Sequence, residues 1–149
     1  LTICVPYPSF ILDPVDELPP GIERKRVENR SREMLYRGPL LIHAGLSKKW
    51  MATVRFEQRP TNPVYGAIVG VVDVIDCCHI LELTGPIDTW SRRVLDKYIW
   101  LPRHQHASGP FCIVLENPVK FEKPIPYKGA QGLFNVPDHV VAEQLKAVA

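Results

Sequence analysis

Residues 21–45 read GIERKRVENRSREMLYRGPLLIHAG, and this stretch joins a run of charged side chains to an apolar segment. Between residues 23 and 37, six basic side chains accompany three acidic ones, a local charge of +3, whereas the whole chain of 149 residues carries +2. A clustered positive field attracts phosphate groups, which a uniformly mixed surface does not. The stretch therefore indicates either an anion-binding segment or a solvated ribbon whose charges pair with one another.

We expect the backbone of residues 25–30 to be extended. In a strand, side chains alternate between two faces, so one face would carry Lys25, Val27 and Asn29 and the other Arg26, Glu28 and Arg30. On this register the face of Glu28 and Arg30 can meet a ligand while Val27 anchors the backbone.

A turn at residues 38–39 is expected to lead into a buried strand at 40–42 that ends in His43. A histidine at the end of an apolar strand is usually a core residue bonded to the backbone. The alternative, which the sequence leaves open, is that His43 contacts a ligand.

The rest of the chain predicts short strands separated by about three helices. The longest β-branched run, 66–76, predicts a central strand. The other expected elements are strands at 1–5, 111–115, 119–125 and 132–136, a helical turn at 7–12, a loop at 13–20 that could cover the site, and helices at 47–59, 86–98 and from Asp138 onward. This order favours one α+β domain with a small, mostly antiparallel barrel.

Ser47 is the expected N-cap of the helix at 47–59, with Trp50 and Val54 on its buried side. Lys48 and Lys49 would then lie in its first turn, where cations oppose the helix dipole. Either one of them is held there to bind an anion, or both are simply solvated.

Composition excludes a membrane protein, because no apolar run approaches the roughly 20 residues that span a bilayer. The chain is 46% apolar and 23% charged, as in ordinary globular proteins. The start does not resemble a signal peptide. Four cysteines at positions 4, 77, 78 and 112 fit no zinc or redox motif. Reduced thiols in a cytoplasmic protein are expected, with a secreted domain holding two disulfides as the alternative.

His104 and His106 would place two imidazoles on one side of an extended loop. Two ligands are too few for zinc, and no third ligand stands at a diagnostic spacing. We therefore expect no metal, and we expect these histidines to meet RNA phosphate or solvent.

The charged stretch also resembles the motif of ASCH domains, which belong to the PUA-like superfamily of small RNA-associated barrels. The residues that carry the resemblance are Gly21, Lys25, 28–31 (ENRS), 36–39 (YRGP) and 41–44 (LIHA), with further similarity at 1–3, 6–7, 11–12, 66–73, 109–115, 124–126, 129 and 132–134. The similarity spans nearly the full chain. It implies a single ASCH domain over residues 1–149, with a PUA-like pseudobarrel flanked by about three helices.

The resemblance further implies a cleft between barrel and helices that binds RNA, a nucleotide or a nucleoside, without a cofactor. Lys25, Arg30 and Arg37 would hold phosphate, and Glu28 or Asn29 would read polar edges. Tyr7 would offer a stacking face, or else simply pack beside Pro6 and Pro8.

The alternative that the resemblance implies is an enzyme, a ribonuclease or an amidohydrolase acting on a modified nucleoside, with Lys25 and Glu28 as its catalytic pair. The amidohydrolase branch places a threonine three residues after the lysine, whereas this chain has Glu28 there. That departure weakens direct nucleophilic catalysis, although a Lys and Glu pair could still activate water. A protein-interaction adaptor is a third class that the sequence leaves open.

Overall fold

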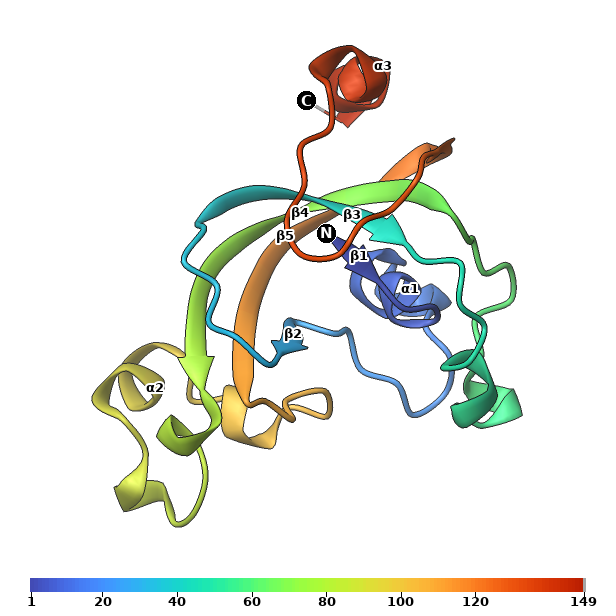
Figure 1. The fold of residues 1–149 in the computed structure, drawn as a ribbon. Coiled ribbons are helices and arrows are strands. Elements are labelled where there is room, and N and C mark those ends of the chain that lie inside the picture. Colours follow the sequence, from blue (N-terminus) through green and yellow to red (C-terminus); the bar gives the residue numbers. More distant parts are fainter. Residues whose placement is uncertain (149) are drawn as a thin grey trace. The chain divides into compact units, whose positions relative to one another are not determined.

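The computed structural model describes residues 1–148, which contain three α-helices and five β-strands (Figure 1). In chain order these are β1 (Thr2–Ile3), α1 (Tyr7–Leu12), β2 (Val27–Arg30), β3 (Gly38–Ala44), β4 (Ala67–His79), α2 (Arg92–Lys97), β5 (Phe111–Pro126) and α3 (Asp138–Val148). Short 3₁₀ turns interrupt the connections. The α+β class expected from the sequence is confirmed.

The strands form one mostly antiparallel sheet in the order β1-β3-β4-β5-β2. The sheet is open and does not close into the small barrel that the sequence favoured. Its two edge strands are short, two residues in β1 and four in β2, and they offer few backbone groups for closing the sheet. Short edge strands are also a common way to limit pairing with other chains.

The strands expected at 40–42, 66–76 and 111–115 correspond to β3, β4 and β5, which are neighbours in the sheet. Val and Ile are the commonest aliphatic residues of β4, and such a run suits a strand whose faces are both covered. The predicted strands at 111–115 and 119–125 are joined in a single strand, β5. The turn expected at 38–39 instead opens β3.

Three other expectations are corrected. Residues 47–59 form no α-helix but two 3₁₀ turns, Met51–Thr53 and Phe56–Gln58. Ser47 Oγ accepts from the Lys49 N–H, as an N-cap does, but no α-helix follows. Residues 132–136 contain no strand, and of 86–98 only α2 is α-helical, with Ser91 as its N-cap.

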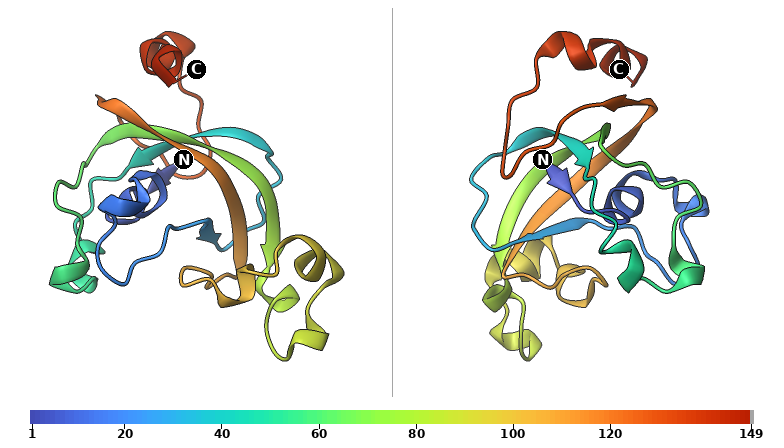
Figure 2. Two further views of the ribbon diagram at one scale, coloured as in Figure 1. Left: turned by 180° about the vertical axis from the view of Figure 1, so that it is seen from behind. Right: turned by 45° about the vertical axis from the view of Figure 1, so that its right-hand side comes forward.

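The chain folds into two compact units. Unit 1 comprises Leu1–Arg24, Pro39–Val72 and the C-terminal segment from Asn117, and unit 2 comprises Lys25–Gly38 and Asp73–Glu116. Within unit 1, α1 and α3 lie on opposite sides of the strands (Figures 1 and 2). Of the three apolar side chains of α3 that the sequence suggests for packing on the sheet, Val141 packs there with Ile68 and Phe121, whereas Leu145 and Val148 are exposed.

Unit 2 has its own apolar core, built from β2, β4, β5 and α2. Its buried members are Val27, Cys78, Leu83, Val94, Tyr98, Leu101, Cys112 and Val114. All four cysteines of the chain are free thiols, and three of them are buried. Among the described residues, no helix combines the length and apolar character needed to cross a membrane.

Candidate functional site

A cluster of three charged side chains lies on β2 and just before it, within unit 2. Lys25 Nζ is 2.9 Å from Glu28 Oε2, and Arg30 Nη2 is 2.9 Å from Glu28 Oε1. Lys25 Nζ also donates to the carbonyl of Val27. The side chains of Lys25 and Glu28 are only 4% and 10% exposed, whereas that of Arg30 is 32% exposed.

The pairing of β2 with β5 explains why these side chains meet. The strands are antiparallel, with Glu28 opposite Ile113 and Arg30 opposite Phe111. Val27 points into the unit 2 core, so Glu28 and Arg30 share the other face, as the alternation predicted. Lys25 departs from that alternation because it precedes the first residue of β2, and its long side chain folds back onto Glu28.

Buried charges are costly unless they are paired and hydrogen-bonded. Here one carboxylate lies between two cations, so the cluster carries a net positive charge. Its partly exposed member, Arg30, leads from the buried Lys25 and Glu28 toward solvent. Such an arrangement offers N–H donors to an anionic or carbonyl oxygen and one carboxylate to a donor.

Asn29 lies on the face of β2 opposite to Glu28 and Arg30. Its side chain forms hydrogen bonds with the loop that precedes β5. Its Oδ1 accepts from the N–H groups of Ser108 and Gly109, both at 2.9 Å. Its Nδ2 donates to the carbonyl of His106 at 2.7 Å. The amide of Asn29 therefore orders the loop, and its hydrogen bonds leave little capacity for reading a base.

Arg26, which directly precedes β2, forms a second contact with that loop through His104. The Arg26 N–H donates to His104 Nε2 at 3.0 Å, and the Arg26 guanidinium lies 3.8 Å from the centre of the Trp100 ring. His104 packs in turn against His106, with ring centres 5.5 Å apart. Among residues 1–148, no group of three or more potential ligands could hold a metal ion.

Asp76, near the C-terminal end of β4, is the centre of a charged network that no sequence motif indicated. Its Oδ1 lies 2.9 Å from Arg93 Nη1 and 3.4 Å from Arg37 Nη2. It also accepts from the Cys77 N–H at 2.8 Å. Arg37 donates in addition to the carbonyls of Met34 and Tyr36. Arg37, predicted to hold phosphate, is thus engaged within the protein.

Arg93 bridges Asp76 to Glu82, whose Oε2 lies 2.7 Å from Arg93 Nη2. Burial opposes ionisation of Glu82, but hydrogen bonds from Arg93, from the His79 N–H and from Ser91 outweigh it and lower the pKa of Glu82. Burial and a hydrogen bond to Asp76 raise the pKa of Tyr98 to about 12. Spacing could not reveal this network, because its members come from β4, α2, the 3₁₀ turn Ile80–Glu82 and the segment just before β3.

The remaining predicted site residues lie in unit 1. His43 is 2% exposed, and its Nε2 lies 2.7 Å from the carbonyl of Tyr127, while Nδ1 lies 3.2 Å from Thr2 Oγ1. It is a core histidine bonded to the backbone, the more frequent role. Tyr7 packs edge-on against Phe10, and Lys48 lies 5.6 Å from the Tyr65 ring centre.

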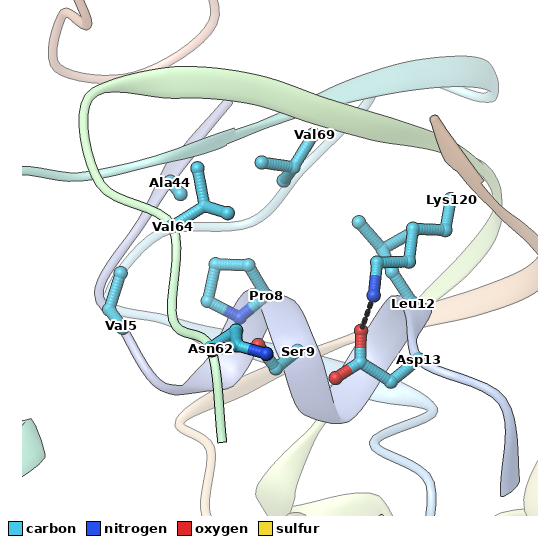
Figure 3. A pocket seen from close by; sticks show the side chains of 10 residues that line it. All are labelled: Val5, Pro8, Ser9, Leu12, Asp13, Ala44, Asn62, Val64, Val69 and Lys120. Carbon is cyan, nitrogen blue, oxygen red and sulfur yellow. Dashed lines mark ion pairs between the residues drawn. The ribbon is translucent and has the colours of Figure 1, made fainter. Parts of the chain in front are cut away.

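Unit 1 also contains a shallow pocket between α1 and the strands (Figure 3). The hollow and the open solvent at its mouth together occupy about 350 Å³. Apolar side chains line most of it, and the ion pair between Lys120 and Asp13, 2.7 Å, lies at one side. None of the predicted site residues lines this pocket.

Comparison with protein-family models and with characterised proteins found no match for this chain.

Proposed function

We propose that this chain is an RNA- or nucleotide-binding domain of the ASCH type, within the PUA-like superfamily, and that residues 21–31 build its ligand site. One observation carries the proposal: Lys25, Glu28 and Arg30 form a mostly buried cluster with more positive than negative charge. The cluster falls on the residues where the sequence resembles the ASCH motif. The four free thiols are in keeping with a reducing, cytoplasmic setting.

In this proposal the roles divide by hydrogen-bonding capacity. Lys25 and Arg30 donate to a phosphate or a base carbonyl, since a guanidinium suits planar and anionic oxygen acceptors. Glu28 accepts from a base N–H. Asn29 and Arg37 act as positioning residues, because their polar atoms bond to the loop at 106–109 and to Asp76.

Lys25 and Glu28 are also the basis of the enzymatic alternative, a hydrolase in which these two side chains activate water. The geometry favours binding, because Lys25 Nζ donates to Glu28 and to the Val27 carbonyl. A general base needs a free acceptor within reach of the proton it removes. Glu28 could take that role, and the Glu28→Gln variant decides between the two.

A thermal-shift screen with nucleosides, mononucleotides and short RNAs tests the proposal, because any ligand of the native state raises the melting temperature by mass action. We expect at least one nucleotide ligand to raise it in the parent protein, and Glu28→Gln and Arg30→Gln to reduce that shift. Glu122→Gln, at an exposed position of β5, is the matched control and should behave as the parent.

If the parent responds to none of these ligands, the proposal fails. Turnover of an RNA or a nucleoside amide that Glu28→Gln abolishes, with affinity retained, would replace the binding function by the enzymatic one.

A further inference from the structure

The segment at residues 46–59 of unit 1, here called the 46–59 segment, exposes large apolar side chains beside free cations. Leu46, Trp50 and Phe56 are 77%, 44% and 83% exposed. Large apolar side chains are normally placed inside a protein, so a concentration of them on one exposed segment marks an interaction site.

The charge of the 46–59 segment is strongly one-sided. It contains four bases, Lys48, Lys49, Arg55 and Arg59, and one acid, Glu57. Within the part of the chain that the structure describes, the side chains of Lys49 and Arg55 have no ion-pair or hydrogen-bond partner, and both residues are exposed. These two cations are therefore available to an anionic partner.

The bases of the 24–37 stretch contrast with them, since five of the six are engaged within the protein. Arg24 donates to the carbonyls of Ile11 and Asp13, Arg26 covers Trp100, and Lys25, Arg30 and Arg37 are ion-paired. In the 24–37 stretch only Arg32 is left available, whereas the 46–59 segment offers both Lys49 and Arg55 together with exposed aromatic rings.

Packing holds the Trp50 ring of the 46–59 segment in place. Trp50 lies 6.4 Å from Tyr7, which contacts Phe10 edge-on at 5.9 Å. Phe10 is only 1% exposed, so the three rings form a connected series from the core to the surface. The two 3₁₀ turns are also fixed, because Thr53 Oγ1 donates to the Trp50 carbonyl and Gln58 Nε2 to the Pro20 carbonyl.

Aromatic faces on which bases stack, together with cations that follow the phosphates, are the two components of surfaces that bind single-stranded nucleic acid. A protein partner with an acidic apolar surface would match the charge equally, but it would not require flat rings beside unpaired cations. We propose that the 46–59 segment binds single-stranded RNA, with Trp50 and Phe56 stacking on bases and Lys48, Lys49 and Arg55 contacting phosphates.

The proposal rests on the proposed function and adds to it a surface and a substrate class. A single-stranded RNA is favoured over a duplex, because bases paired inside a helix do not offer their faces to a side chain. The ligand cluster around Glu28 and the 46–59 segment are then two separable parts of recognition, and the second of them does not affect binding of a mononucleotide.

Fluorescence anisotropy with a labelled single-stranded RNA of about 12 nucleotides tests the proposal. We expect Trp50→Ala and Phe56→Ala each to weaken binding roughly 5- to 150-fold, the effect of losing one stacked base. Leu81→Ala, at an exposed position of unit 2 (73%), is the control and should bind as the parent. Phe56 is the more exposed of the two aromatic residues, so its variant remains informative if Trp50→Ala loses stability.

The salt dependence provides a second measurement. Replacing Lys48 and Lys49 together by Gln should reduce the slope of log affinity against log salt by about 1.4, that is about 0.7 for each lost phosphate contact on a single strand. Lys128→Gln, at an exposed lysine outside the segment, should change affinity and slope by less. Duplex RNA of the same sequence should bind more weakly than the single strand.

Mononucleotide binding, followed in parallel by thermal shift, separates the two proposals. If nucleotides and RNA both bind and the 46–59 variants bind RNA as the parent does, the inference is overturned while the proposed function stands. Binding of mononucleotides without any binding of RNA would overturn the inference in the same way. If neither ligand binds, both proposals fail. If the 46–59 segment binds a protein selectively and does not bind RNA, the inference is also overturned.

Discussion

Lys25 Nζ lies 2.9 Å from Glu28 Oε2, and the two side chains are 4% and 10% exposed. A buried ion pair is weak evidence of stability, because removing two charges from water costs about as much as their attraction returns. Replacing only one of the two partners destabilises the protein, because the other charge stays buried without a partner. This asymmetry makes the cluster testable without any knowledge of the ligand.

Glu28→Ala should destabilise the protein by about 3–5 kcal/mol, because Lys25 and Arg30 both lose their common partner. The double variant Lys25→Met/Glu28→Leu should cost less than Glu28→Ala alone. Urea unfolding of the parent and both variants provides the comparison. A single variant as stable as the parent would mean that the pair is open to water.

Asn29→Ala should release the loop before β5, because it removes one acceptor for two backbone N–H groups and one donor to the His106 carbonyl. Leaving such groups unsatisfied costs about 1–3 kcal/mol. Hydrogen exchange should accelerate at the amides of Ser108 and Gly109. Asn135→Ala, at an exposed position, should leave those exchange rates unchanged.

Acidification should weaken the network around Arg93. The pKa of Glu82 is lowered in the folded state, where the bonds from Arg93, His79 and Ser91 outweigh burial. The stabilisation is therefore complete above the unfolded value of about 4.3 and is lost as the pH falls through the lower folded value. Urea midpoints between neutral and acid pH should show this decline.

Glu82→Gln should flatten that pH dependence, because the variant has no carboxylate to protonate. It should also lower stability at neutral pH, where the parent keeps its ion pair. An equally steep acid decline in Glu82→Gln would show that other carboxylates dominate it.

The thiols should differ sharply in reactivity. Burial raises the pKa of Cys77, Cys78 and Cys112, to about 12 for Cys78, and the thiolate is the reactive form. Cys4 is only half-buried. Mass spectrometry after brief alkylation of the folded protein should find one modified thiol, and Cys4→Ser should abolish that fast phase.

Local signals explain what the sequence predicted. The helix α1 and the strand β4 follow from short-range patterns, a proline-started apolar turn and a β-branched run. The predicted helix at 47–59 failed because only Trp50 and Val54 supported it, and the β-branched Thr53 disfavours a helix. Helical periodicity over so few positions is weak evidence.

In the candidate site, too, the directions of side chains inside a regular element were predicted correctly and those outside one were not. Alternation along β2 placed Glu28 and Arg30 on one face, because both lie within a regular element. It misplaced Lys25, which lies outside the strand, where periodicity no longer applies. The link from Asp76 to Arg93 spans 17 positions, and no local pattern encodes such a contact, which depends on how α2 packs beside β4.

The two compact units are interleaved along the chain, which passes between them after residues 24, 38, 72 and 116. Two of these passages lie inside β4 and β5. No single cut can therefore yield a contiguous fragment that contains one whole unit and nothing of the other. For anyone dissecting this protein genetically, terminal deletions will remove pieces of a shared scaffold, and point substitutions are the proper instrument for assigning roles.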